Sequence, residues 1–421
     1  MRLKFDRLAL RRRGKRIYYK TIPGAESVHL RIGFPIGGLD DPVGKEGLIH
    51  FLEHVVLNGS RSLCSPAAVR EFDRRCMLGS KNGTTSSDFV YFSCRFLPED
   101  AKQVLQKFFE LVFRPLFLAI EDERKIILQE LAQRRFGNKA ILRKIRIELA
   151  DQYGGHPLSR YSGAAGWIES VRAITEHDLR QWHDECLKGN GATVTLLGAV
   201  SRDILNIAAD EMEKYTGDGC LARTDKVFDL PHCPATTVRL FGPSDVGMIE
   251  LTQSKLHFVT YLPRQIPQAH LEVAVGLLRE LLLRKWREKM SATYGVSVRW
   301  SNNGYRTIIS ISSSLDPRQT NAAVKYIRTA IQQVGDGTFH DLIQEQRLLE
   351  MLMWRASELS LSLTSNAIIE EFLSDGGLKS MSERAAMLED TTPDHVESLF
   401  RQFMGPENTY LQLQTPTGKL Q

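Results

Sequence analysis

The sequence predicts an α+β fold made of two homologous α/β-sandwich halves that face each other across a cleft. The same order of predicted strands and helices occurs twice along the chain, at an offset of about 217 residues. Within each half, strands and helices alternate irregularly, and hairpins take the place of a repeated strand-helix-strand unit. The length of 421 residues also exceeds what one hydrophobic core usually organises, so we expect at least two domains.

The first repeated pair of elements is a strand followed by a helix. Residues 89–96 (FVYFSCRF) are rich in aromatic side chains and predict a strand, and a helix follows over residues 97–112. In the second half, residues 307–312 (TIISIS) predict the strand and residues 315–334 the helix. This unit is therefore expected once in each half.

The second repeated pair is a capped helix followed by a strand. Thr175 and Thr392 each stand at a predicted helix start and are followed by proline or acidic residues in the first turn. A threonine hydroxyl in this position accepts hydrogen bonds from the free amides of the first turn. The strands predicted at residues 192–197 and 409–413 complete the repeat.

These repeats set the expected domain limits. We assign residues 1–216 to an N-terminal half and residues 247–421 to a C-terminal half. Residues 217–246 mix Gly, Pro and Asp with short apolar runs, and we predict a linker with edge structure there. A duplicated fold places a cleft between its halves, which is a natural position for a substrate.

Composition and charge exclude several classes of protein. Lys and Arg outnumber Asp and Glu by only 55 to 50, and the basic run at residues 11–16 predicts a hairpin with solvated arms. No apolar stretch reaches the length of about 18 residues that a membrane span needs, and no signal peptide is visible. Six irregularly spaced cysteines without a C-x-x-C pair predict free thiols. We therefore expect a cytoplasmic protein with no nucleic-acid or membrane partner.

The strongest chemical signal is a polar stripe on an otherwise apolar helix at residues 47–59 (GLIHFLEHVVLNG). A helix that is apolar on nearly every side is buried, so its polar side chains need partners. His50, Glu53 and His54 fall within one arc of about 100°. Histidines four residues apart lie one turn above each other, which lets both imidazoles bind one metal ion. The H-x-x-E-H order reverses H-E-x-x-H but keeps ligands and base on one face.

A third ligand is predicted on a helix further along the chain. Within residues 121–135, Glu123 and Glu130 share the face that carries Ile127 and Leu131. A carboxylate in an apolar stripe is costly unless it is paired. We predict Glu130 as the third ligand and Glu123, two turns earlier, as a residue that orients a ligand or pairs with an arginine. The alternative is a solvent-exposed helix that carries many charged side chains.

Two histidines and a glutamate with one open position form a donor set of catalytic zinc. Zinc lowers the pKa of a bound water to about 7, and Glu53 is placed to accept the proton as general base. At the offset that aligns the halves, His54 matches Leu271 and Glu130 matches Arg347, so we expect one Zn²⁺ per chain. Manganese or cobalt would fit the same ligands.

Taken together, these residues resemble the pitrilysin and insulin-degrading-enzyme family of inverted zincins, in particular its short-chain branch that includes the mitochondrial processing peptidase. The likeness covers almost the whole chain and continues in residues 58–60 (NGS), 82–85 (NGTT) and 153–157 (YGGHP). Members of this branch often pair two chains, so the resemblance implies a homodimer.

The resemblance adds two residues of the second half to the candidate site. Residues 283–295 (LRKWREKMSATYG) are similar to the family's Arg/Tyr motif. This similarity implies that Arg287 and Tyr294 reach across the cleft to the substrate, with the tyrosine as a hydrogen-bond donor near the oxyanion. The residues alone leave open that Tyr294 is a half-buried aromatic of a strand.

The resemblance also implies a substrate-binding edge. Asn82, Gly83, Thr84 and Thr85 match the segment against which substrate lies in the family, and an exposed edge binds extended peptides through backbone hydrogen bonds. Asn-Gly is also a strong turn signal, and both interpretations can hold together.

The sequence thus predicts a zinc metalloendopeptidase that hydrolyses short, unfolded or extended peptides. One alternative is a maturation peptidase dedicated to one precursor or leader peptide, since cleavage specificity depends on the shape and charge of the cleft. Another is a noncatalytic scaffold or partner subunit of the same fold. The complete set of metal and base residues favours the enzyme over the scaffold.

Overall fold

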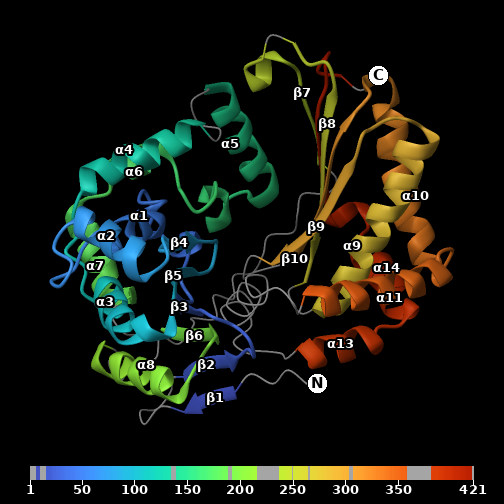
Figure 1. The fold of residues 1–421 in the computed structure, drawn as a ribbon. Coiled ribbons are helices and arrows are strands. Elements are labelled where there is room, and N and C mark those ends of the chain that lie inside the picture. Colours follow the sequence, from blue (N-terminus) through green and yellow to red (C-terminus); the bar gives the residue numbers. More distant parts are fainter. Residues whose placement is uncertain are drawn as a thin grey trace. The chain divides into compact units, whose positions relative to one another are not determined.

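The computed structural model describes residues 6–9, 16–133, 139–187, 192–215, 237–248, 250–263, 266–302, 307–357 and 381–419. These residues form two compact units (Figure 1). The first unit comprises the described residues of 6–133 and 160–215, and the second those of 139–159, 237–357 and 381–419. Most of the predicted linker, residues 217–236, lies outside the described residues, and the predicted domain limits remain a prediction.

The first unit contains one six-stranded sheet with the strand order β1-β2-β6-β3-β5-β4. Its strands are β1 (Asp6–Ala9), β2 (Arg16–Thr21), β3 (Val28–Phe34), β4 (Asn82–Thr85), β5 (Val90–Phe96) and β6 (Thr193–Gly198). Its α-helices are α1 (Leu48–Val56), α2 (Pro66–Cys76), α3 (Ala101–Phe113), α4 (Ile120–Leu131), α6 (Ile168–Ala173), α7 (Glu176–Trp182) and α8 (Arg202–Tyr215). β1 and β2 form the predicted antiparallel hairpin, whose connection at residues 10–15 lies outside the described residues.

The second unit contains a five-stranded sheet with the order β7-β11-β8-β10-β9. Its strands are β7 (Thr237–Phe241), β8 (Ser254–Leu262), β9 (Val296–Asn302), β10 (Thr307–Leu315) and β11 (Thr409–Gln414). Its α-helices are α5 (Lys139–Tyr153), α9 (Gln268–Leu282), α10 (Thr320–Gly335), α11 (His340–Ser357), α13 (Met381–Glu389) and α14 (Pro393–Phe403), and α9 continues as the π-helix η7 (Leu283–Lys289).

The two sheets share one topology, which confirms the predicted internal duplication. In the first, β2 and β6 are parallel and every other neighbouring pair is antiparallel. In the second, β7 and β11 are the parallel pair, and the remaining pairs are again antiparallel. The order β2-β6-β3-β5-β4 therefore matches the order β7-β11-β8-β10-β9, and β1 has no counterpart among the described residues of the second sheet.

The predicted repeated elements are also present. The strands expected at residues 89–96 and 307–312 are β5 and β10, and the helices that follow them are α3 and α10. Thr175 is the N-cap of α7, where its hydroxyl accepts a hydrogen bond from the amide of Asp178 at 3.2 Å. Thr392 is the N-cap of α14. None of the helices in the described parts of the chain combines the length and the hydrophobicity needed to cross a bilayer.

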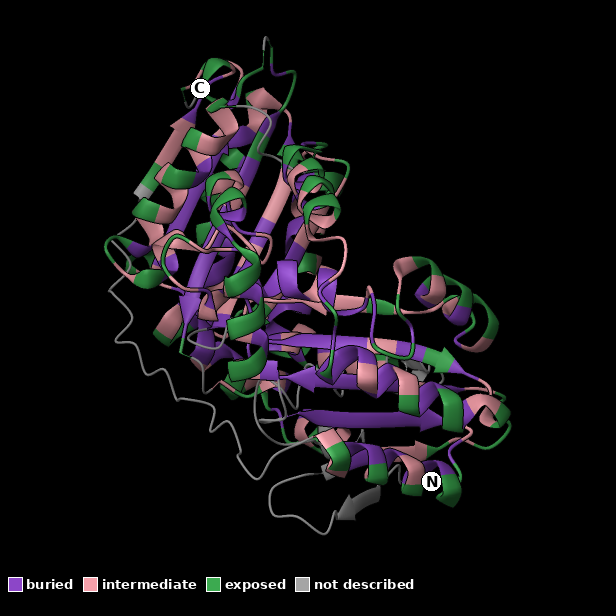
Figure 2. Ribbon diagram, turned by 90° about the vertical axis from the view of Figure 1, so that its left-hand side faces the viewer, coloured by how far each residue is buried: buried purple, intermediate pink, exposed green. Residues whose placement is uncertain are grey.

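The core of the first unit consists of aromatic and aliphatic side chains from the sheet and its helices. Phe34 of β3 packs edge-to-face on Phe92 of β5 and Phe113 of α3, with ring centroids 6.3 and 6.0 Å apart. Phe51 of α1 is fully buried, as the apolar sequence of this helix predicts. Figure 2 shows the central strands of both sheets as mainly buried, while the helices carry exposed residues along their outer faces.

The start of α1 is fixed by a buried carboxyl group. Both oxygens of Asp41 accept backbone hydrogen bonds, from the amide of Gly47 at 2.6 Å and from that of Ile49 at 2.9 Å. Gly47 has a left-handed φ of 98°, and a Cβ there would lie 2.5 Å from the carbonyl oxygen of Ala165. Burial raises the pKa of Asp41 to about 8, although the two amides act in the opposite direction. These contacts set where the helix begins.

Replacing Asp41 by Ala should lower the free energy of unfolding by about 1 to 2 kcal/mol, because two amides at the helix start lose their acceptor. Urea unfolding followed by circular dichroism measures the change. Asp122, which is exposed, serves as control, and its replacement by Ala should change stability by less than about 0.5 kcal/mol. Equal effects of the two substitutions would contradict the capping role of Asp41.

Candidate metal centre

Helix α1 carries His50, Glu53 and His54 toward Glu130 of α4. The imidazole centroids of His50 and His54 lie 4.7 Å apart, and His50 is only 8% exposed. One side-chain donor atom from each of His50, His54 and Glu130 lies within 4.8 Å of the others. The structure thus brings together the three residues that the sequence predicts as ligands.

Helix α4 places its two candidate carboxylates, Glu123 and Glu130, by the burial of its apolar face. Ile127 and Leu131 are buried, and this anchors the helix in the unit beside α1. Glu123 lies in the first turn, where negative charge is favoured by the helix dipole. Glu130 lies two turns later, and its Oε1 is 3.9 Å from Nε2 of His54.

Glu123 orients the imidazole of His54. Its Oε2 lies 3.0 Å from Nδ1 of His54, and its Oε1 accepts a hydrogen bond from the amide group of Asn58 at 2.9 Å. Burial acts to raise the pKa of Glu123, but these two hydrogen bonds outweigh it and lower that pKa. An ionised carboxylate only accepts, so Nδ1 of His54 carries a proton, and in the neutral imidazole the lone pair is on Nε2, the nitrogen that lies 3.9 Å from Oε1 of Glu130.

The same contacts act on the pKa of His54. Burial acts to lower this pKa, but the hydrogen bond to Glu123 and the negative charge of Glu53 outweigh it and raise the pKa. The imidazole is therefore held by carboxylates on several sides. A divalent cation would neutralise this excess of negative charge.

Glu53 lies partly buried between α1 and β4. The hydroxyl of Thr85 donates a hydrogen bond to its Oε2 at 3.2 Å, and Nε2 of His50 lies 3.9 Å from the same oxygen. Gly83 packs against its side chain so closely that a Cβ there would lie 2.5 Å from Cγ of Glu53. Burial raises the pKa of Glu53, which is the direction that suits a general base.

Strand β4 contains all four residues that the sequence predicts as a substrate-binding edge. Asn82 to Thr85 form the end of the six-stranded sheet and pair on one side with β5. The Asn82-Gly83 pair lies within this strand, so the turn that Asn-Gly often forms does not occur at these residues. The reason is tertiary, because pairing with β5 and contact with Glu53 favour an extended backbone.

Lys81 and Asn58 are polar neighbours of the centre that the sequence analysis did not assign. Burial lowers the pKa of Lys81, while the charges of Glu123 and Glu53 act to raise it. The asparagine could have been found as the first amide side chain after the apolar helix. Lys81 gives no comparable signal, because only the folding of β4 back onto α1 brings it to these carboxylates.

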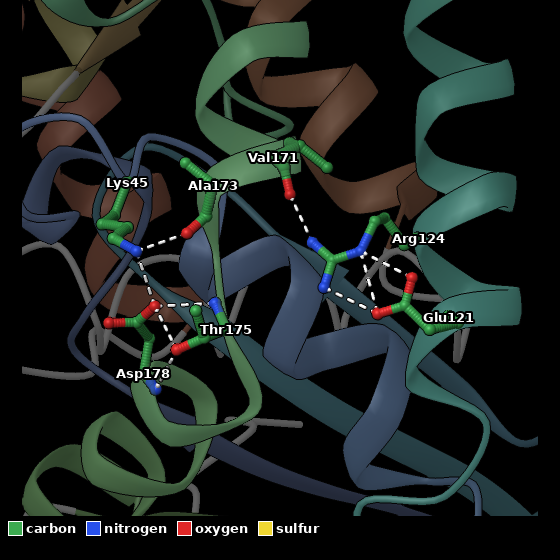
Figure 3. Close-up of polar contacts among 7 residues, drawn as sticks. All are labelled: Lys45, Glu121, Arg124, Val171, Ala173, Thr175 and Asp178. Carbon is green, nitrogen blue, oxygen red and sulfur yellow. Dashed lines mark hydrogen bonds and ion pairs between the residues drawn. The ribbon is translucent and has the colours of Figure 1, made fainter.

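Arg124 joins α4 to its neighbours (Figure 3). Its Nη1 donates a hydrogen bond to the carbonyl oxygen of Val171 in α6 at 2.6 Å, and Nη2 forms an ion pair with Glu121 at 3.0 Å. The guanidinium carbon lies 5.0 Å above the ring of Phe51 in α1. One side chain thus ties together three helices that surround the candidate ligands.

Lys45 makes the second connection drawn in Figure 3. Its ammonium group donates to the carbonyl oxygen of Ala173 and forms an ion pair with Asp178 at 2.7 Å. Asp178 also accepts a hydrogen bond from the amide of Thr175 at 2.7 Å, which completes the capping box of α7. The loop that leads into α1 is therefore held to the start of α7.

Arg287 and Tyr294 both lie in the second unit, in η7 and just before β9. The guanidinium carbon of Arg287 is 5.2 Å from the ring centroid of Tyr294, so the structure brings these two predicted residues together. The side chain of Tyr294 is 89% exposed, which excludes the half-buried strand position considered from sequence.

The second unit lacks the donors at the positions that match the first. Leu271 is buried in α9, and Arg347 of α11 donates a hydrogen bond to the carbonyl oxygen of Glu389 at 2.8 Å. An aliphatic side chain and a guanidinium are not zinc ligands. These positions of the second unit have packing and hydrogen-bonding roles.

Two imidazoles and one carboxylate that converge beside a further carboxylate are the donors found in hydrolytic zinc proteins. A model of the insulinase family, peptidase family M16, matches residues 16–157, and a model described as the peptidase M16 inactive domain matches residues 173–343. The chain belongs to this family. An uncharacterized zinc protease of Streptomyces coelicolor is 21% identical over 407 residues, which cover 93% of this chain and 86% of that protein.

Solved structures show the same fold. A protease from Helicobacter pylori has a TM-score of 0.83 at 13% identity, and the match covers 99% of this chain and 100% of that one. The peptidase M16 inactive domain from Pseudomonas fluorescens has a TM-score of 0.81 at 16% identity and covers 98% of both chains. These likenesses agree with the predicted α+β fold of two homologous halves.

Replacing Asp178 by Asn should lower the free energy of unfolding by about 1 kcal/mol at neutral pH, because the partner of Lys45 and half of a capping box are lost. Burial acts to raise the pKa of Asp178, but hydrogen bonds from Lys45 and Thr175 lower it from 3.8 to about 2. The contribution of the carboxylate is therefore complete above about pH 4 and is lost as the pH falls toward 2.

Urea unfolding of the parent chain and of the Asp178→Asn variant at several pH values measures how the contribution of this carboxylate depends on pH. The difference in stability between them should stay constant from about pH 7 to about pH 5 and shrink below about pH 4. A difference that grows on acidification would contradict the assignment of this carboxylate as a charged partner.

Proposed function

We propose that this chain is a zinc metalloendopeptidase that hydrolyses short, unfolded or extended peptides. The observation that carries the proposal is the convergence of donor atoms from His50, His54 and Glu130 within 4.8 Å of one another, with Glu53 at their side. Several relatives are named zinc proteases, which supports zinc as the metal.

The donor set of His50, His54 and Glu130 fits a single zinc ion. His50, His54 and Glu130 would hold it, and Glu123 would keep His54 in the tautomer that leaves Nε2 to the metal. When bound, zinc supplies a Lewis acid that makes water more acidic and polarises a carbonyl group. Three partly buried carboxylates, Glu53, Glu123 and Glu130, lie close together here, and a cation would reduce their mutual repulsion.

Glu53 is the proposed general base. It accepts the proton of the attacking water and passes it to the leaving amine. The hydrogen bond from Thr85 and the contact with Gly83 hold the carboxylate in one orientation, so it needs little rearrangement to act.

The edge strand β4 is the proposed binding site for the peptide backbone. Asn82 and Thr84 lie on a strand at the end of its sheet, where an extended peptide can add a further strand through main-chain hydrogen bonds. Main-chain pairing recognises an extended backbone more than particular side chains, which agrees with extended substrates of mixed sequence.

Arg287 and Tyr294 are proposed as hydrogen-bond donors to the peptide carbonyl as it gains negative charge. Their support is the motif in the sequence together with the exposed phenol and its guanidinium neighbour. A homodimer remains a proposal that rests on the resemblance in sequence. A maturation peptidase for one dedicated precursor would use the same groups, and a noncatalytic subunit would not need Glu53.

Replacing Glu53 by Gln should keep the zinc content and lower kcat at least about a hundredfold, which is the contribution of a general base. Glutamine keeps the size and hydrogen bonding of the side chain but does not take up the proton. Zinc analysis of the purified chain and hydrolysis of an unstructured peptide library, read by mass spectrometry, measure the two quantities. Undiminished cleavage by this variant would remove the mechanism, and an inactive parent chain would favour the noncatalytic alternative.

Replacing Gly83 by Ala should lower kcat by roughly tenfold to a hundredfold, because the added methyl group displaces the carboxylate of Glu53. The backbone of Gly83 is extended, so alanine is not strained there and the overall fold should persist. Gly155, whose Cβ position meets no atom within 4 Å, provides the matched control for the same substitution. Equal activities of the two variants would show that Glu53 is not constrained by β4.

A further inference from the structure

A second group of potential metal ligands lies in the second unit, at the starts of α11 and α14. Donor atoms of His340, Asp394 and Glu397 lie within 4.8 Å of one another. Nδ1 of His340 is 3.1 Å from Oε1 of Glu397. This group shares no residue with the candidate metal centre of the first unit, so its properties do not depend on the proposed function.

The backbone positions of these ligands are fixed by the ends of three helices. α10 ends in a turn in which the amide of Thr338 donates to the carbonyl oxygen of Gln333 at 3.0 Å, and Gly337 has a left-handed φ of 79°. His340 follows as the first residue of α11. The guanidinium of Arg401 in α14 donates to the carbonyl oxygen of Gly335 at 3.0 Å, which holds α14 against this turn.

The three residues are not an ordinary cluster of exposed charged side chains, because Glu397 is buried. Its side chain is 7% exposed and shares α14 with the buried residues Val396 and Phe400. Asp394, one turn earlier on the same helix, brings a second negative charge to it. Two carboxylates and one imidazole leave an excess of negative charge, which a divalent cation would neutralise.

The donor chemistry selects the kind of cation. One imidazole nitrogen together with carboxylate oxygens suits first-row transition ions such as Zn²⁺, whereas Mg²⁺ and Ca²⁺ prefer oxygen ligands alone. His340 is 49% exposed, so an ion can reach it from solvent. We propose that His340, Asp394 and Glu397 form a second zinc-binding site, which joins the start of α11 to α14.

Zinc stoichiometry tests this site separately from the first. The full chain without an affinity tag is dialysed against micromolar Zn²⁺, and bound metal is measured by elemental analysis. We expect two ions in the parent chain, one in His54→Ala, one in His340→Ala and none in the double variant. His340 and Asp394 are exposed, so His340→Ala and Asp394→Asn should fold normally, which circular dichroism checks.

The exposed Asp341 is next to His340 but outside the cluster, so Asp341→Asn is the matched control and should keep both ions. A zinc content that is unchanged in both His340→Ala and Asp394→Asn would overturn the second site. Zinc that binds these residues only at millimolar concentration would overturn it as well, because the contact of His340 with Glu397 would then be a simple hydrogen bond. Failure of the first site would be seen separately, as an unchanged zinc content in His54→Ala.

Discussion

The carboxylate of Glu123 determines how the two helices of the candidate metal centre meet. It accepts from His54 in α1 and from Asn58 just beyond that helix, while Glu130 of the same helix α4 lies near the other nitrogen of His54. One imidazole is thus held between two carboxylates that are seven residues apart on one helix. The relative position of α1 and α4 is set by this polar contact as well as by the burial of Ile127 and Leu131.

The duplication separates fold from chemistry. Both units have the same strand order around one parallel pair, but the second has a leucine and an arginine where the first has the candidate ligands His54 and Glu130. The sheet topology depends on apolar packing and backbone pairing, which these exchanges leave intact. The exchanges do remove the donors, so a copy of this fold can lose a metal centre without losing its architecture.

Much of the candidate centre follows from helical periodicity. His50, Glu53 and His54 share a face because of their spacing, and an apolar stripe that includes Glu130 predicts a carboxylate turned inward. Local caps such as Thr175 were also predictable, because the hydroxyl and the acidic residue of the box lie three positions apart. These features depend only on neighbours within one element.

The unpredicted contacts all join segments whose meeting depends on the whole fold. Thr85 and Gly83 reach Glu53 across 32 and 30 residues because β4 folds back against α1. The contact of His340 with Glu397 spans 57 residues and requires the ends of two helices to converge. No spacing rule relates such residues, since the intervening chain can vary in length without changing the contact.

Through the contact of Gly83 with Glu53, β4 positions a carboxylate in addition to forming the edge of the sheet. Gly83 of this short strand packs against the carboxylate of Glu53, and the outer backbone groups of the strand are the ones that an added strand would pair with. A bound peptide that moved β4 would also move the carboxylate of Glu53, because Gly83 belongs to the strand and is in contact with Glu53. Binding of a peptide to β4 would therefore be coupled to the orientation of the Glu53 carboxylate, because Gly83 contacts Glu53 directly and no loop lies between them.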